Sequence, residues 1–288
     1  MTNALRITGA TRLYAILGDP IVQVRSPEVF TERFAAANVN AVLVPALVPA
    51  EHFDKIIPAL MALGNLDGLL VTVPFKARMV PFASRLGAAA KCIGAVNALR
   101  REVDGSWTGD MFDGEGFVRG IERKAERLRG RRVLLFGAGG AGSAIACALA
   151  GAEVESIGIV DPDAGRVEAL VEALRRAFPD CDLAAATSKA ADVDMIVNAS
   201  PVGMRPGDGM PGDIGTLSSD TLVGDVVISE SPTALVQHGL RHGCRCVNGH
   251  DMHSGQIEAI MNFFAPGTPA SLGVSSLILD QQRQTGST

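Results

Sequence analysis

The sequence predicts an α/β protein with two domains. From about residue 12 to residue 110, short β-rich runs alternate with helical stretches, which is typical of a parallel sheet covered on both faces. A second unit begins at Arg131 with a buried strand, a glycine-rich turn and a helix of small residues. The chain has 288 residues, of which 47% are apolar, so it can form one large or two medium-sized domains with a sizeable core.

The first domain shows two types of periodicity in succession. Runs rich in β-branched and aliphatic residues predict strands, and the stretches between them carry apolar residues at helical spacing. The predicted strands cover residues 13–17, 41–45 and 68–73, and the predicted helices cover residues 27–38 and 51–63. The polar stretch Arg100–Gly116 is the predicted link to the second domain.

The second domain continues the alternation. After the strand and helix in residues 131–150, further strands are predicted in ESIGIVDPD, VDMIVNAS and TLVGDVVI, with helices over residues 164–178 and 256–264. We expect the final helices to return to the first domain. The predicted boundaries are therefore a first domain of residues 1–108 completed by residues 237–288, and a second domain of residues 109–236.

Composition excludes several classes of function. The net charge of −5 argues against nucleic acid as a partner, and the basic run Arg119–Arg132 is interleaved with glutamates as on a solvated helix face. No signal peptide and no transmembrane segment are expected, so we predict a cytoplasmic protein without a membrane partner. The five cysteines are scattered and form no zinc-binding spacing, which predicts reduced thiols and no metal site.

The glycine-rich turn predicts a dinucleotide site. Gly137, Gly139 and Gly142 fit the pattern GxGxxG between a strand and a helix. The first glycine permits a tight turn, the second lets a pyrophosphate approach the main chain, and the third lets the helix pack closely on the strand. Free N–H groups at the start of this helix favour a bound phosphate.

Asp161 predicts which dinucleotide binds. It lies at the end of the next strand, 24 residues after Gly137, where a carboxylate accepts hydrogen bonds from ribose hydroxyls and repels a 2′-phosphate. No arginine follows it directly, so we expect NAD rather than NADP. A role of Asp161 as the N-cap of the helix that starts near Ala164 is compatible with this prediction.

Three polar residues are candidates for acid–base chemistry. Lys76 follows a predicted strand and Pro74, Asn97 lies in CIGAVNAL, and Asp113 lies in TGDMFDGEGF. Oxidation of an alcohol by hydride transfer needs a base for the hydroxyl proton, and a lysine with a nearby carboxylate can serve. Taken singly, Lys76 could be a solvated surface residue, Asp113 a helix cap and Asn97 a turn residue.

Several stretches in order resemble the shikimate/quinate dehydrogenase family over nearly the full chain. They are Gly18-Asp-Pro-Ile21, Ser26-Pro27, Val71-Thr-Val-Pro-Phe-Lys76, Gly94-Ala-Val-Asn97, Asp113-Gly-Glu-Gly116, Gly137-Ala-Gly-Gly-Ala141, Asn198-Ala-Ser-Pro-Val-Gly-Met204 and Gln256. The resemblance implies a substrate domain and a Rossmann-type dinucleotide-binding domain with a cleft between them. It also implies that Lys76 and Asp113 are the catalytic pair.

The same resemblance implies the remaining site residues. Substrate contacts would come from Ser26, Thr72, Asn97 and Gln256. The cofactor site would comprise Gly137, Ala138, Gly139, Gly140, Ala141, Asp161, Asn198, Ser200, Pro201, Val202, Met204, Val226, Gly249 and Met252, with the stretch from Asn198 near the nicotinamide.

Departures from the family pattern cluster at the expected substrate pocket. The positions that carry apolar residues in place of hydrogen-bonding ones are Val24, Leu70, Met111, Phe112 and Ile228, and Gln23 replaces a histidine. Each lost hydrogen bond to a charged group is worth about 1.5–3 kcal/mol, which makes efficient shikimate turnover doubtful. Alternatively, Arg25 could turn inward and hold a substrate carboxylate.

The sequence thus predicts an NAD-dependent oxidoreductase acting on a ring hydroxyl of shikimate, quinate or a related cyclic hydroxy acid, as a monomer or homodimer. A non-catalytic NAD-binding sensor and a dehydrogenase of another small substrate on the same architecture are the alternatives.

Overall fold

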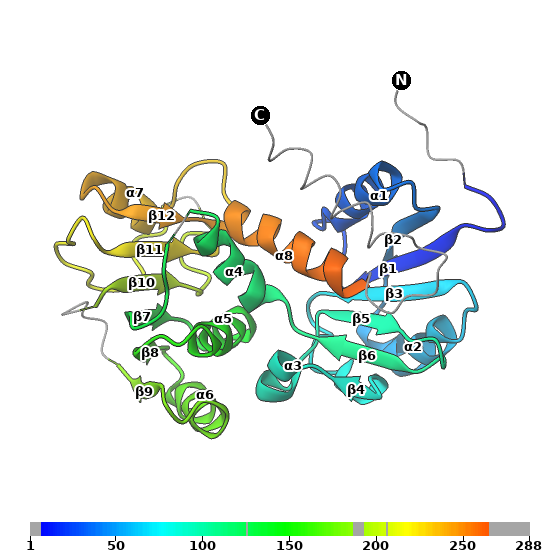
Figure 1. The fold of residues 1–288 in the computed structure, drawn as a ribbon, viewed down its shortest axis with the longest axis horizontal. Coiled ribbons are helices and arrows are strands. Elements are labelled where there is room, and N and C mark those ends of the chain that lie inside the picture. Colours follow the sequence, from blue (N-terminus) through cyan, green and yellow to red (C-terminus); the bar gives the residue numbers. More distant parts are fainter. Residues whose placement is uncertain (1–6, 125, 187–192, 206, 265–288) are drawn as a thin grey trace. The chain divides into compact units, whose positions relative to one another are not determined.

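The computed structural model describes residues 7–124, 126–186, 193–205 and 207–264 (Figure 1). The chain divides into two compact units. Among the described residues, the first comprises residues 7–90, Gly94–Asp110 and residues 260–264. The second comprises Lys91–Ile93 and Met111–Ala259. Each unit contains one six-stranded sheet.

The sheet of the first unit has the strand order β2-β1-β3-β5-β6-β4. Strand β1 runs parallel to both β2 and β3, while β5 is antiparallel to β3 and to β6. Its strands are β1 (Arg12–Gly18), β2 (Ala41–Leu47), β3 (Leu66–Val71), β4 (Arg85–Leu86), β5 (Ala98–Arg101) and β6 (Trp107–Asp110). Its helical segments are α1 (Ser26–Ala36), η1 (Ala50–His52), α2 (Phe53–Met61), η2 (Val80–Phe82) and α3 (Ala88–Ile93), although the last three residues of α3 group with the second unit.

One expectation for this part of the chain was wrong, because the sheet is mixed rather than wholly parallel. The chain does pass from the first unit to the second within Arg100–Gly116, between Asp110 and Met111. This stretch is nevertheless structured, because it contains the end of β5, all of β6 and the start of helix α4 (Asp113–Glu122). The polar residues that suggested a link form the turn of a β-hairpin. Within this turn the Glu102 carbonyl accepts a hydrogen bond of 3.0 Å from the N–H of Gly105, the N–H of Glu102 donates to the Ser106 carbonyl, and Gly105 adopts a φ of +82°.

The core of the first unit lies on both faces of its sheet. On one face, Leu17 and Leu69 pack in a cluster with the stacked rings of Phe53 and Phe75, whose centroids are 4.7 Å apart. Because side chains alternate along a strand, Tyr14 points to the other face. There its ring packs against Phe34 of α1 and Phe264.

The sheet of the second unit is entirely parallel, with the strand order β12-β11-β10-β7-β8-β9 (Figure 1). Its strands are β7 (Arg132–Phe136), β8 (Ser156–Val160), β9 (Asp182–Ala185), β10 (Met195–Asn198), β11 (Leu222–Asp225) and β12 (Arg245–Val247). Its helices are α4 (Asp113–Glu122), α5 (Gly140–Gly151), α6 (Ala164–Ala177), α7 (Ala234–Arg241) and most of α8 (Gly249–Phe264). The strand order reverses between β7 and β10, which is the switch point where doubly wound sheets bind ligands.

The division between the units differs from the expected one at its second boundary. Helix α7, strand β12 and residues 249–259 of α8 belong to the second unit, and the chain returns to the first unit only at Ile260. The physical reason is that β12 pairs with β11, and α8 then packs on α4. A Cβ atom added at Gly116 of α4 would lie 2.7 Å from the backbone nitrogen of Gln256, so only a glycine allows this crossing.

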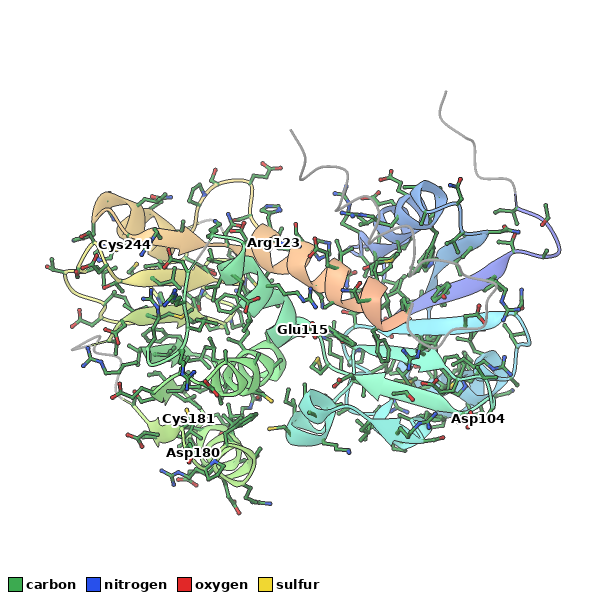
Figure 2. The ribbon with its side chains drawn as sticks, viewed as in Figure 1. Asp104, Glu115, Arg123, Asp180, Cys181 and Cys244 are labelled. Atoms are coloured by element: carbon green, nitrogen blue, oxygen red, sulfur yellow. The ribbon has the colours of Figure 1, made fainter. Side chains whose placement is uncertain are left out.

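Ion pairs reinforce the crossing of α4 and α8. The guanidinium of Arg123, directly after α4, pairs with Glu258 on α8, and Lys124 pairs with Asp251 at 2.8 Å. Figure 2 labels Arg123 and, nearer the start of α4, Glu115. Among the helices in the described residues, none is long and apolar enough to span a membrane.

Candidate active site

The glycine-rich turn has the geometry of a phosphate-binding loop. It joins β7 to α5, and Gly137 adopts a φ of +103° that only glycine adopts readily. A Cβ atom at Gly137 would lie 2.7 Å from the Ala199 carbonyl oxygen, and one at Gly142 would lie 1.9 Å from the Gly137 carbonyl oxygen. The helix N-terminus begins at Gly140, so its free N–H groups are directed at the switch point.

Asp161 is tied to this loop by its carboxylate. Oδ2 accepts a hydrogen bond of 2.8 Å from the backbone N–H of Ala138, and Oδ1 accepts one of 2.9 Å from Asp163. Burial favours the neutral acid, but the backbone hydrogen bonds from Ala138 and Asp163 and the charge of Arg166 outweigh it and lower the pKa of Asp161. A charged carboxylate therefore lies beside the loop after β7.

The turn that follows β10 lies on the other side of the switch point. Asn198, the last residue of β10, leads into this turn and is buried at 1% exposure. Its amide Nδ2 donates to the Val202 carbonyl at 2.8 Å, while its Oδ1 accepts from the backbone and the hydroxyl of Ser200. The remaining expected cofactor residues of this turn are Pro201 and Met204, and Met204 is 69% exposed.

A small cavity of about 170 Å³ lies where β11 and β12 end. It is lined by residues that include Val227, Thr233 and His250. The expected cofactor residues Val226 and Gly249 are neighbours at this end of the sheet. A Cβ atom added at Gly249 would lie 2.6 Å from the carbonyl oxygen of Val226.

In the first unit, backbone hydrogen bonds gather the expected substrate residues at the carboxyl ends of β1 and β3. The N–H of Thr72 donates to Leu17 at 2.9 Å, and the N–H of Val96 donates to the Lys76 carbonyl at 3.0 Å. Asn97 is 3% exposed, and its carbonyl accepts from the N–H of Val71 at 2.8 Å.

The stretch Gly18–Phe30 joins the same region. The N–H of Asp19 donates to the Val73 carbonyl at 3.0 Å, and a Cβ atom at Gly18 would lie 2.5 Å from the methyl of Thr72. Ser26, the first residue of α1, is half-buried. This stretch therefore lies beside the loop that carries Thr72 and Lys76.

In the second unit, helices α4 and α8 bring two expected site residues into direct contact. Nε2 of Gln256 donates a hydrogen bond of 2.6 Å to Oδ1 of Asp113. Asp113 is 5% exposed and is the first residue of α4, where the helix dipole stabilises a negative charge. Met252, one turn before Gln256, packs its carbonyl against Gly116.

The residues that depart from the family pattern differ in burial. Leu70, Met111 and Phe112 are buried, Val24 is half-buried, and Ile228 is 58% exposed. Arg25 does not turn inward. Its side chain is 76% exposed and pairs with Glu28 on the same helix, so the structure does not support the alternative that Arg25 replaces the missing carboxylate contact.

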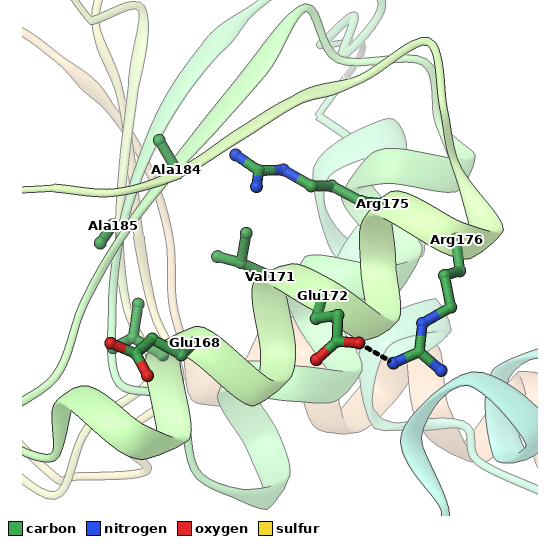
Figure 3. Close-up of a pocket in the computed structure, with 8 residues that line it drawn as sticks. Glu168, Val171, Glu172, Arg175, Arg176, Ala184 and Ala185 are labelled. Carbon is green, nitrogen blue, oxygen red and sulfur yellow. Dashed lines mark hydrogen bonds and ion pairs between the residues drawn. The ribbon is translucent and has the colours of Figure 1, made fainter.

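A larger cavity of about 600 Å³ lies between α6 and the edge strand β9 (Figure 3). Figure 3 shows Glu172 and Arg176 paired along the helix, with Ala184 and Ala185 on the strand. None of the expected site residues lines this cavity. Among the described residues, no group of three or more histidine, cysteine or acidic side chains could hold a metal ion.

Asp225 and Thr233 were missed among the candidate residues. Asp225 ends β11 directly opposite Asn198, and its carboxylate accepts hydrogen bonds from Asn198 and Thr233. The available signal was an aspartate at the end of the otherwise apolar strand run TLVGDVVI. The burial of Asp225 and its hydrogen-bond partners depend on the register of β10 and β11, so only the structure shows them.

The glycine-rich loop at the switch point of a doubly wound sheet, with an acidic residue after the second strand, defines the class of dinucleotide-binding oxidoreductases. Residues 16–99 match the shikimate dehydrogenase substrate binding domain, and residues 117–168 match the ThiF family. A shikimate dehydrogenase (NADP(+)) of Rubrobacter xylanophilus is 37% identical over 254 residues, which cover 86% of this chain and 88% of that protein. The chain belongs to the shikimate dehydrogenase family.

Solved structures agree with this assignment. The shikimate 5-dehydrogenase of Listeria monocytogenes in complex with shikimate and NAD superimposes with a TM-score of 0.84 at 26% identity, covering 95% of this chain and 98% of that one. The quinate dehydrogenase of Corynebacterium glutamicum in complex with NAD gives a TM-score of 0.81 at 26% identity, covering 94% and 99%.

Proposed function

We propose that this protein is an NAD-dependent dehydrogenase that interconverts a ring hydroxyl and a ketone on a cyclic hydroxy acid. The observation that carries the proposal is the buried Asp113 carboxylate, held by Gln256 at the start of α4, in a chain that also contains the dinucleotide loop. A carboxylate fixed in this way suits the orientation of a hydroxyl and of a proton-accepting lysine.

Lys76 and Asp113 form the proposed acid–base pair. In the oxidation direction, Lys76 takes the proton of the substrate hydroxyl as the C–H bond breaks, and Asp113 orients the hydroxyl and the ammonium that forms. In the reverse direction, Lys76 returns the proton to the oxygen of the ketone. Bound NAD supplies the hydride acceptor at C4 of its nicotinamide. Ser26, Thr72, Asn97 and Gln256 contribute the proposed substrate contacts.

The proposed cofactor is NAD. The charged carboxylate of Asp161 lies beside the loop and is bonded to the N–H of Ala138, where it repels a 2′-phosphate. The solved relatives of Listeria and Corynebacterium are described with NAD, whereas the relative of Rubrobacter is named for NADP(+). Asp161 is the reason to favour NAD in this chain.

The proposed substrate is shikimate, quinate or a less polar analogue. The relatives are named for shikimate and for quinate. The buried apolar side chains of Leu70, Met111 and Phe112 replace hydrogen-bonding groups, so they favour a ring acid with fewer hydroxyls.

The test is to follow NAD reduction with shikimate, quinate, aminoshikimate and less hydroxylated ring acids. We expect turnover of at least one of these acids, and Lys76→Ala should lower kcat by about 10²–10⁴-fold while leaving NAD affinity nearly unchanged. Lys55→Ala on α2 is the control, because Lys55 is an exposed lysine of the same unit. Full activity of Lys76→Ala would refute the role of Lys76. NAD binding without turnover of any of these acids would favour a non-catalytic sensor.

A further inference from the structure

Asp225 is a fully buried carboxylate, and within the part of the chain that the structure describes no basic side chain is bonded to it. Its exposure is 0%, and it accepts three hydrogen bonds. Oδ1 accepts from Nδ2 of Asn198 at 3.1 Å and from the N–H of Val227 at 3.0 Å, and Oδ2 accepts from the hydroxyl of Thr233 at 2.6 Å. Burial raises the pKa of Asp225 against the opposing effect of these three donors. Burial of a carboxylate is costly, and a buried network whose hydrogen bonds are all made holds its members rigidly in place.

The orientation of the Asn198 amide follows from these bonds. Nδ2 faces two acceptors, the Asp225 carboxylate and the Val202 carbonyl, and Oδ1 faces two donors, the N–H and the hydroxyl of Ser200. An amide has two donor hydrogens and two acceptor lone pairs. All four are used inside the protein, so this amide has no capacity left for a cofactor.

Thr233 connects the network to a helix. Its hydroxyl donates to Asp225 and accepts the N–H of Val236 at 3.3 Å, which caps the start of α7. The Asp225 carboxylate therefore joins three segments at the carboxyl end of the sheet, namely the turn after β10, the start of the segment after β11, and α7.

We propose that Asp225 and Thr233 are positioning residues that hold Asn198, and that Asn198 shapes the turn 198–204 without touching the cofactor through its amide. The backbone and the side chains after Asn198 then present the surface for the nicotinamide half of the dinucleotide. This inference rests on the proposed function. It assigns Asn198 a role in shaping the site, and it adds two residues that the family resemblance did not supply.

The position of the turn explains why its shape matters for one half of the ligand. In a doubly wound sheet the adenosine half lies on the side of Asp161 and β8, and the other half lies across the switch point on the side of β10 and β11. Removal of the hydrogen bond between Asn198 and Asp225 should therefore weaken binding of the nicotinamide half and leave the affinity for the adenosine half unchanged.

The experiment compares the affinities of NADH and of ADP-ribose, which lacks the nicotinamide, in wild-type protein and in Asp225→Ala. We expect the affinity for NADH to fall about tenfold or more, and the affinity for ADP-ribose to change less than about twofold. Asp225→Asn keeps an acceptor for Asn198 and Val227, so it should restore most of the NADH affinity. A protein that is merely destabilised would lose both ligands together.

Asp194→Ala is the matched control, because Asp194 accepts hydrogen bonds from Arg132 just before β10, at the opposite end of that strand. It should leave the two affinities in their wild-type ratio. If Asp225→Ala does not fold, Thr233→Val carries the same test, with a smaller loss again confined to NADH. Equal losses of both ligands, or no loss of NADH affinity, would overturn the inference. If wild-type protein binds neither ligand, the proposed function fails first, and the inference fails with it.

Discussion

The side-chain amide of Gln256 donates a hydrogen bond of 2.6 Å to the carboxylate of Asp113, although 143 residues separate them in the chain. The bond joins the first residue of α4 to the middle of α8, at the crossing that Gly116 permits. It engages Oδ1 of the Asp113 carboxylate. The first prediction follows from this relationship.

Gln256→Ala should lower kcat/KM by about 10–100-fold, because a hydrogen bond to a charged group is worth about 1.5–3 kcal/mol and each 1.4 kcal/mol is about tenfold. Steady-state kinetics with the best substrate of the acid panel measure the effect. Glu258→Gln, on the same helix and paired with Arg123, is the control and should change kcat/KM less than about twofold. Unaltered kinetics of Gln256→Ala would contradict the proposed roles of Gln256 and Asp113.

Asp161 should determine the choice of cofactor. We expect wild-type protein to prefer NAD over NADP in kcat/KM, and Asp161→Asn to reduce that preference about tenfold by removing a negative charge beside the expected 2′ position. Asp163→Asn is the control, because Asp163 caps α6 and asparagine caps equally well. Equal use of both cofactors by wild-type protein would show that Asp161 does not select NAD.

Tyr14→Phe should stabilise the protein. The Tyr14 hydroxyl is buried and has no hydrogen-bond partner within the described part of the chain, while its ring packs against Phe34 and Phe264 at 4.7 and 4.8 Å. Removing an unsatisfied hydroxyl recovers about 1 kcal/mol, which raises Tm by about 2–4 °C. Thermal unfolding followed by circular dichroism measures the change. Phe34→Leu is the control, because it removes ring contacts with Tyr14, and it should lower Tm. A lower Tm for Tyr14→Phe would show that the Tyr14 hydroxyl has a hydrogen-bond partner in solution.

Asp194 should contribute to acid sensitivity. Hydrogen bonds from the side chain and backbone of Arg132 lower the pKa of Asp194 below its ordinary value of 3.8, against a smaller effect of burial. A folded-state pKa below the unfolded one means that the ionised group stabilises the fold above pH 3.8, and that this stabilisation is lost as the pH falls through the folded-state pKa.

The measurement is Tm against pH for wild-type protein and Asp194→Asn. Wild-type protein should be the more stable at about pH 6, and the difference should shrink as the pH falls below about 4. Asp180→Asn is the control, because Asp180 is exposed. A difference in Tm that is constant with pH would mean that the pKa of Asp194 is the same in the folded and unfolded states.

Much of the fold follows from short-range patterns. The alternation of strands and helices, and the loop around Gly137, depend on residues a few positions apart, so periodicity and glycine spacing were enough to predict them. The mixed sheet of the first unit was not predictable in this way. The pairing of β5 with β6 is made by a hairpin whose turn has the same polar composition as a linker, and the antiparallel pairing of β5 with β3 joins segments that are distant in the chain.

The sequence by itself determined the class of protein. The glycine-rich loop and Asp161 follow successive strands in the pattern of a dinucleotide site, and several motifs in order resemble the shikimate/quinate dehydrogenase family. Only the tertiary structure decided which partners these residues have. The Gln256–Asp113 bond requires two helices to cross at a glycine, and the bonds of Asp225 to Asn198 and Thr233 require the register of two parallel strands. Such contacts depend on packing between distant segments, and no local pattern encodes them.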